Sequence, residues 1–84
     1  VQDVPPFILA ADYPLKYKGV NLVGLKRRGF SSEDRKSIKK IYKIYFKSGL
    51  NRGDALNKIQ TEIKSSIVKN QIIEFIKASD RGII

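Results

Sequence analysis

The sequence lacks cysteine and histidine, and these absences exclude several kinds of chemistry. Without cysteine there is no disulfide, no thiolate metal site and no thiol nucleophile. Without histidine the chain has neither the commonest metal ligand nor the most frequent general base near neutral pH. The carboxylates form no obvious catalytic pair. We therefore expect no metal site, and we find no reaction that this chain alone would catalyse.

Methionine is also absent, and no apolar run approaches the ~18–20 residues of a membrane span. The first residues, 1–6, carry neither the basic start nor the apolar core of a signal peptide. Because the chain opens on valine and contains no methionine, we expect it to be a fragment or a processed product.

The charge is strongly one-sided: 17 basic against 8 acidic residues in 84, a formal net charge of +9. A domain this small buries only about 60% of its unfolded surface, so its core is thin. A positive charge of this size favours an acidic partner such as a nucleotide, a nucleic acid, an anionic lipid or an acidic protein. For any single lysine, a merely solubilising role is the alternative.

All three prolines lie in residues 1–18, which we expect to form an extended arm, since proline disfavours helix at and before its own position. Within the arm, Phe7–Ala10 is predicted to be a short strand and Asp12–Lys18 a loop. A strand this short is not stable alone and must pair with another segment, such as sequence upstream of the chain.

Residues 19–84 are expected to form a helical domain, because capping residues and glycines divide them into amphipathic segments. The predicted helices are Val20–Arg28, Ser31–Ser48, Asn51–Lys64 and Ile67–Ser79. Short linkers favour roughly antiparallel neighbours. The predicted fold class is mainly α, a small bundle of about four helices preceded by an extended N-terminal arm.

The first three predicted helices have a start signal, and all four have an apolar side. Ser31, with Asp34 three residues on, resembles a capping box, and Gly49 is the expected terminator of that helix. Apolar residues at helical spacing are expected to be buried: Val20, Leu22, Val23 and Leu25 in the first helix, then Ile38, Ile41, Tyr42, Tyr45, Leu56, Ile59, Ile63, Val68, Ile72, Phe75 and Ile76.

The most informative stretch runs from Gly19 to Phe30 and reads GVNLVGLKRRGF. Asn21 stands at a helix start, where free N–H groups attract anions, and Arg27 and Arg28 stand at the end. Guanidinium forks match phosphate oxygens, and an asparagine amide both donates and accepts hydrogen bonds. Together they suit a nucleotide diphosphate. The alternative is ordinary helix chemistry, in which Asn21 is a cap and the basic residues complement the helix dipole.

A second basic group lies in the longest predicted helix. Five lysines at helical spacing share one face, opposite the apolar stripe: Lys36, Lys39, Lys40, Lys43 and Lys47. This ridge suits an acidic helix or a phosphate backbone, and a solvated outer face is the alternative. A stand-alone nucleic-acid-binding module is therefore a competing function, although a ridge of lysines alone favours backbone contact over base reading.

The stretch from Gly19 to Phe30 closely resembles a signature of the acyl-[acyl-carrier-protein]:UDP-N-acetylglucosamine O-acyltransferases, which start lipid A synthesis. Three further segments agree in order. Residues 4–7 resemble the exit from that family's left-handed parallel β-helix, residues 41–49 a following helix end, and residues 79–83 the C-terminal tail. The resemblance covers essentially the whole chain and identifies it as a C-terminal domain of that family.

The resemblance implies a cytoplasmic homotrimer of β-helices, in which residues 1–18 would end the last coil. It implies acyl carrier protein and UDP-N-acetylglucosamine as partners, with no nucleic acid and no cofactor. A histidine in a β-helix coil would activate the sugar 3-hydroxyl to attack the acyl thioester. Because this chain has no histidine, it is expected to be inactive alone.

The resemblance also assigns residues to the two partners. Asn21, Arg27 and Arg28 match positions that line the nucleotide-sugar site, whereas Val23 stands where an acidic residue is common. The lysine ridge, with Lys39 at its centre, resembles the surface that meets the acidic carrier protein.

Overall fold

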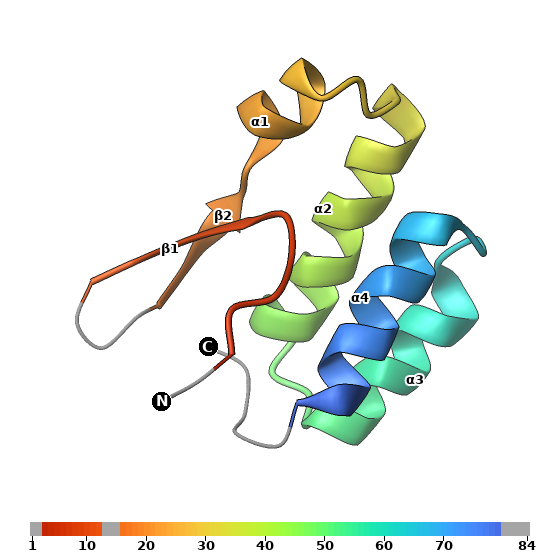
Figure 1. Cartoon of the computed structure of the whole chain (residues 1–84). Helices are drawn as coiled ribbons and strands as arrows, with labels where there is room; N and C mark the ends of the chain where they lie inside the picture. Colours follow the sequence, from red (N-terminus) through yellow and green to blue (C-terminus); the bar gives the residue numbers. More distant parts are fainter. Residues whose placement is uncertain (1–2, 13–15, 80–84) are drawn as a thin grey trace.

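The computed structural model describes residues 3–12 and 16–79, which form a two-stranded sheet and four helices (Figure 1). The elements are β1 (Ile8–Ala11), β2 (Lys16–Val20), α1 (Leu22–Arg27), α2 (Ser32–Lys47), α3 (Arg52–Glu62) and α4 (Ile67–Ala78). In Figure 1, α2 lies between the hairpin on one side and the neighbouring α3 and α4 on the other. Over the described residues, the predicted mainly α fold with four helices is confirmed.

The two strands pair with each other in antiparallel order, so β1 finds its partner within the chain. Ile8 lies opposite Val20 and Ala11 opposite Lys16, with an irregularity in the middle of the pair. The predicted loop is therefore wrong from Lys16 onward, and the first helix begins later than Val20. In β2, exposed lysines alternate with the half-buried Tyr17, and this period of two is the strand signal that the sequence did contain.

Every helix begins at a side chain that accepts a hydrogen bond from the backbone N–H three residues on, at 2.8–3.1 Å. The capping residues are Asn21, Ser31, Asn51 and Ser66. Gly29 and Gly49, with φ of 82° and 76°, follow α1 and α2 in the left-handed conformation that favours glycine. The predicted C-terminal tail covers residues 79–83, and all of it after Ser79 lies outside the described residues.

The core surrounds α2, which contacts β2, α1, α3 and α4. The largest fully buried side chains are Tyr42, Leu25, Ile38, Ile41, Ile59, Ile72 and Ile76. Because α2 packs on two sides, the buried positions form a broader band than the predicted stripe. Three side chains expected in the core are only half-buried, Tyr45, Leu56 and Phe75, while the structure buries Ile44, Ala55 and Ile73 instead.

Among the helices, the burial of α1 differs most from the prediction. Only Leu25 of α1 is buried, whereas Leu22 and Val23 are 41% and 64% exposed. A helix of six residues that contacts α2 along one edge has room to bury little more than one side chain.

A buried lysine closes the end of α3, whose last turn has no basic residue of its own. The ammonium group of Lys69, on α4, donates to the carbonyl oxygens of Ile63 at 2.7 Å and Gln60 at 3.2 Å. A buried ammonium is tolerated where its donors are satisfied, and these carbonyls otherwise lack intrahelical partners. Lys69 therefore joins α4 to the end of α3.

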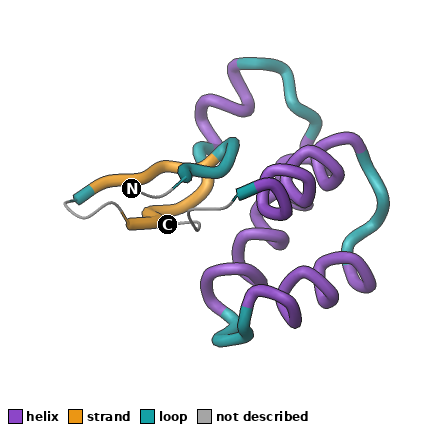
Figure 2. Tube along the Cα trace, turned by 60° about the horizontal axis from the view of Figure 1, so that its bottom comes forward, coloured by secondary structure: helices purple, strands orange, loops and turns teal. Residues whose placement is uncertain are grey.

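The hairpin is attached to α2 by one long-range hydrogen bond and by stacked rings. The Tyr42 hydroxyl donates to the carbonyl of Pro6 at 2.7 Å. Tyr17 of β2 stacks on Phe46 of α2, with ring centroids 4.3 Å apart. The rotated view of Figure 2 also shows the hairpin to one side of the helices, so the α2 face carrying Tyr42 and Phe46 is the hairpin's docking face.

Burial, with a smaller contribution from Tyr17, raises the pKa of Tyr42 well above the ordinary value of 10.0. The folded state therefore favours the neutral hydroxyl that donates to Pro6. This contribution to stability is fully present below about pH 10 and is lost as the pH rises toward the raised pKa.

Tyr42→Phe is expected to lower the free energy of unfolding by about 0.5–1.5 kcal/mol at neutral pH, because the hydrogen bond is lost. It is also expected to reduce the loss of stability in alkali, because the titrating group is removed. Urea unfolding at neutral pH and at about pH 11 measures both effects. Tyr45→Phe is the control for loss of the hydrogen bond at neutral pH, since the Tyr45 hydroxyl bonds to no described residue. Equal alkaline losses in the wild type and Tyr42→Phe would contradict this account.

Candidate functional site

Asn21 stands where β2 passes into α1, and both its backbone and its side chain are engaged. Its N–H donates to the carbonyl of Phe7 at 2.8 Å, and its side-chain oxygen accepts from the N–H of Gly24 at 3.0 Å. The capping role is therefore present. It does not exclude ligand binding, because the Nδ2 end of the amide donates to no described residue.

Gly24 makes room for this arrangement. A Cβ built on Gly24 would lie 2.5 Å from Nδ2 of Asn21, far inside contact distance. Gly53, near the start of α3, is a matched case without the conflict, because its Cβ would lie 3.6 Å from the Asn51 side-chain oxygen.

Two arginines end α1, and both are exposed. The side chain of Arg27 makes no recorded interaction with the described residues. The Arg28 guanidinium carbon lies 5.3 Å from the ring centre of Phe30 and 5.8 Å from that of Phe7. Neither guanidinium pairs with a carboxylate of the described residues, so both stay available to an external anion. We refer to Asn21, Arg27 and Arg28 as the α1 cluster.

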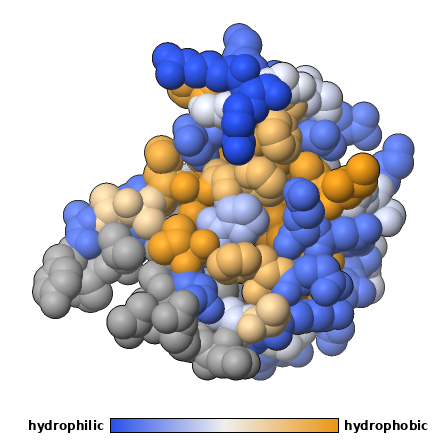
Figure 3. Space-filling model, in the orientation of Figure 1, coloured by the Kyte–Doolittle hydropathy of each residue, from blue (hydrophilic) through white to orange (hydrophobic). Residues whose placement is uncertain are grey.

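Figure 3 shows hydrophilic side chains gathered over the α1 end at the top of the view. Apolar surface lies below them, between the hairpin and the helices. The sequence stretch around the α1 cluster thus forms a polar, basic end of the molecule. The two aromatic rings beside Arg28 could not be foreseen from local sequence patterns, because Phe7 precedes Arg28 by a whole hairpin.

The five predicted lysines are all exposed, and they line a groove between α2 and α3. The groove also contains the Ile44 and Ser48 side chains of α2 and the Lys58 and Glu62 side chains of α3. Residues of the α1 cluster do not line it. We refer to this surface, defined by Lys36, Lys39, Lys40, Lys43, Lys47, Ile44, Ser48, Lys58 and Glu62, as the lysine groove.

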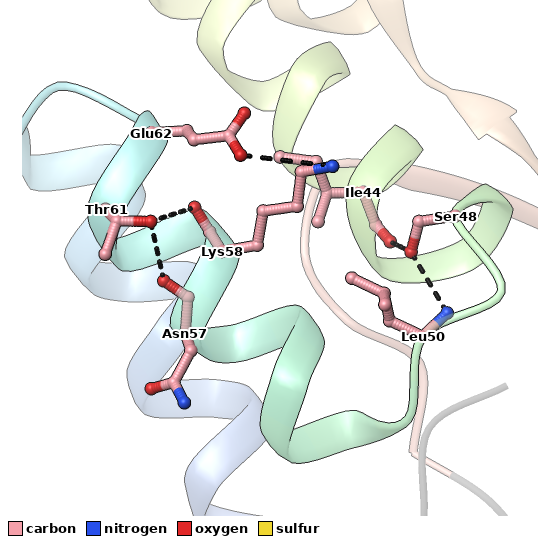
Figure 4. Close-up of polar contacts among 7 residues, drawn as sticks. All are labelled: Ile44, Ser48, Leu50, Asn57, Lys58, Thr61 and Glu62. Carbon is pink, nitrogen blue, oxygen red and sulfur yellow. Dashed lines mark hydrogen bonds and ion pairs between the residues drawn. The ribbon is translucent and has the colours of Figure 1, made fainter.

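The α3 wall of the lysine groove, formed by Lys58 and Glu62, has no signal in the sequence of α2. Figure 4 shows Lys58 reaching along α3 to Glu62, and the atoms of this ion pair are 3.9 Å apart. Both side chains are roughly half exposed, so water weakens the pair. None of the five lysines of α2 pairs with a described carboxylate. The groove therefore keeps a net positive charge over a partly apolar floor.

No group of three or more carboxylates lies close enough to hold a metal ion within residues 3–12 and 16–79. No described helix is both long and apolar enough to cross a membrane.

The comparisons with known proteins first place this small basic helical domain in a class, the acyltransferases. A family model described as UDP N-acetylglucosamine O-acyltransferase, domain 2, matches residues 3–84. The chain belongs to this family of UDP-N-acetylglucosamine O-acyltransferases, which confirms the resemblance drawn from residues 19–30.

Individual relatives belong to the same family of acyltransferases. The acyl-[acyl-carrier-protein]–UDP-N-acetylglucosamine O-acyltransferase of Fusobacterium nucleatum is 45% identical over 82 residues, covering 98% of this chain and 32% of the relative. The same named enzyme from Thermodesulfovibrio yellowstonii is also 45% identical over 82 residues. The chain thus spans about a third of the length of the curated relatives that it matches.

Solved structures give the same result. The UDP-N-acetylglucosamine acyltransferase from Bacteroides fragilis superposes with a TM-score of 0.97 at 45% identity, over 100% of this chain and 33% of that one. The homologue from Acinetobacter baumannii superposes with a TM-score of 0.90 at 33% identity, again over 100% of this chain and 33% of that one. The hairpin and four helices are therefore a shared unit of these larger proteins.

Gly24→Ala is expected to displace the Asn21 side chain with little net change in stability. Loss of the cap costs about 1 kcal/mol, and the higher helix propensity of alanine offsets about 0.5–1 kcal/mol of that. Faster amide hydrogen exchange at position 24 would report the lost acceptor. Gly53→Ala, the control, is expected to keep the Asn51 cap and to stabilise the protein by about 0.5–1 kcal/mol. An unchanged exchange rate at position 24 would argue against the conflict.

Proposed function

We propose that this chain is the C-terminal part of an acyltransferase that moves a 3-hydroxyacyl chain from acyl carrier protein to UDP-N-acetylglucosamine, in the first step of lipid A synthesis. The relatives are named for this carrier and this nucleotide sugar. In the reaction, the sugar 3-hydroxyl displaces the carrier thiol from the acyl thioester, so that an ester and a free thiol form. Family membership does not favour the alternative of a stand-alone nucleic-acid-binding module.

The residues that this chain contains indicate which parts of the reaction it contributes to. It has no histidine to remove the proton of the sugar hydroxyl, so the chain alone is inactive and the general base lies elsewhere in the whole protein. Residues 1–18 belong with the end of a β-helix coil and residues 19–84 form the helical domain. The whole protein is a cytoplasmic homotrimer.

The α1 cluster supplies contacts to the nucleotide sugar. The observation that carries this proposal is that α1 has two exposed guanidinium groups at its end, without carboxylate partners among the described residues, and a capping asparagine at its start whose amide N–H groups donate to no described residue. Guanidinium groups bind phosphate oxygens through two parallel hydrogen bonds. Val23, 64% exposed on the same helix, offers the sugar an apolar surface and no hydrogen bond.

Arg28→Ala in the full-length enzyme is expected to raise KM for UDP-N-acetylglucosamine about tenfold, because a charge-assisted hydrogen bond to phosphate is lost. Steady-state kinetics at saturating acyl carrier substrate measure the change. Lys26→Ala, at an exposed basic residue two positions earlier in the chain, is the control and keeps the wild-type KM. A wild-type kcat/KM in Arg28→Ala would refute the assignment of this residue.

The lysine groove docks acyl carrier protein. Five exposed lysines without ion pairs to the described carboxylates attract an acidic partner, and Ile44 gives the groove an apolar floor. An acidic amphipathic helix matches such a surface, because its carboxylates meet the ammonium groups while its apolar edge covers the floor.

Reversing two of these charges, Lys39→Glu with Lys43→Glu, is expected to weaken carrier-protein binding at low salt and to flatten its salt dependence. Binding is measured by titration at two ionic strengths. The control variant, Lys16→Glu with Lys77→Glu, has the same net charge but changes lysines outside the groove. Equal affinities for the groove variant and the control would show that only the total charge matters.

A further inference from the structure

Phe7 contacts both ends of the α1 cluster. Its carbonyl accepts a hydrogen bond from Asn21 at 2.8 Å, and its ring centre lies 5.8 Å from the guanidinium carbon of Arg28. Gly24 completes the connection, because its N–H donates to the Asn21 side chain and its carbonyl accepts from the Arg28 N–H at 3.1 Å. The contacts among these four residues form a closed circuit.

The backbone of Phe7 is held in a conformation that a residue with a Cβ rarely adopts. Its φ is 71°, in the left-handed region. Two hydrogen bonds hold it there: Tyr42 donates to the preceding carbonyl, of Pro6, and Asn21 donates to the Phe7 carbonyl itself. Such strain persists only where the surroundings over-determine the conformation, and it is concentrated at functional sites.

A second ring completes the surroundings of Arg28. The rings of Phe7 and Phe30 meet edge to face at 5.4 Å, and the guanidinium carbon lies 5.3 Å from the Phe30 ring centre. Arg28 has no carboxylate partner among the described residues, so the two rings are its recorded side-chain restraints. Contact with ring faces leaves the guanidinium N–H groups unbonded and able to donate to an anion.

We propose that Phe7, together with Phe30, is a positioning residue that holds the Arg28 guanidinium in place relative to Asn21 for binding the diphosphate of the nucleotide sugar. The proposal rests on the proposed function of Arg28. A free arginine side chain loses rotamer entropy when it binds a ligand, whereas a side chain already restrained by two rings loses less. The strained backbone of Phe7 aims its ring at Arg28 while its carbonyl anchors the start of α1.

The test measures the dissociation constant of UDP-N-acetylglucosamine by titration calorimetry on the full-length protein, with kcat and KM alongside. Phe7→Leu keeps an apolar side chain but removes the ring, and is expected to weaken binding about three- to tenfold with kcat little changed. Phe7→Tyr keeps the ring and is expected to bind within about twofold of wild type. Phe46→Leu, which removes a ring stacked on Tyr17 away from Arg28, is the control for a general loss of hairpin packing and keeps wild-type affinity.

The decisive comparison is a double-mutant cycle. If the ring acts through Arg28, Phe7→Leu combined with Arg28→Ala binds no more weakly than Arg28→Ala alone. Wild-type affinity in Phe7→Leu, or penalties that add in the double variant, would overturn the positioning role while leaving the function of Arg28 intact. Wild-type affinity in Arg28→Ala would instead overturn the proposed function of Arg28, and the positioning role with it.

Thermal unfolding shows whether each variant is folded. Should Phe7→Leu fail to fold, Phe30→Leu replaces it in the same cycle, since Phe30 does not have a positive φ. Additive penalties for Phe30→Leu and Arg28→Ala would then refute the proposal, and non-additive penalties would support it.

Discussion

The hairpin is held against α2 by the hydrogen bond from the buried Tyr42 hydroxyl to the carbonyl of Pro6, 36 residues away, and by the stacked rings of Tyr17 and Phe46. A domain of this size has a small core, so a hydrogen bond between segments far apart in the sequence contributes to defining the fold. This bond holds the chain immediately before Phe7. The carbonyl of Phe7 in turn accepts a hydrogen bond from Asn21, so the segment that Tyr42 holds also contacts the residue that caps α1.

The helix α2 serves three surfaces at once. Its aromatic residues face the hairpin, its isoleucines face α3 and α4, and its lysines line the groove beside α3. Sixteen residues make between four and five helical turns, which is enough for each surface to have a residue on nearly every turn. A change in how α2 packs would therefore alter the α1 cluster and the lysine groove together.

The charge distribution links the fold to its partners. The ion pairs recorded among the described residues involve Lys18, Lys58 and Lys64, and leave the α1 cluster and the lysines of α2 without carboxylate partners. Unneutralised like charges repel one another, and binding an anion relieves that repulsion. Two basic surfaces without carboxylate partners on one small domain suit the two anionic partners of the proposed function, a nucleotide sugar and an acidic carrier protein.

Local patterns in the sequence determined the helices, their caps at Ser31 and Asn51, and the family resemblance, because each depends on residues within a few turns of one another. Three features depended on the tertiary structure: the pairing of β1 with β2, the α3 wall of the lysine groove, and the position of the Phe7 ring beside Arg28. These features join segments that the sequence separates by ten to twenty residues or more, and the spacing within one helix or strand says nothing about which segment lies opposite. The sequence by itself determined which residues carry positive charge and where the helices capped by Ser31 and Asn51 start. Only the packing of the other elements around α2 decided which of those residues share a surface. Burial of the core fixes how the elements pack, and this packing places side chains from different elements next to one another.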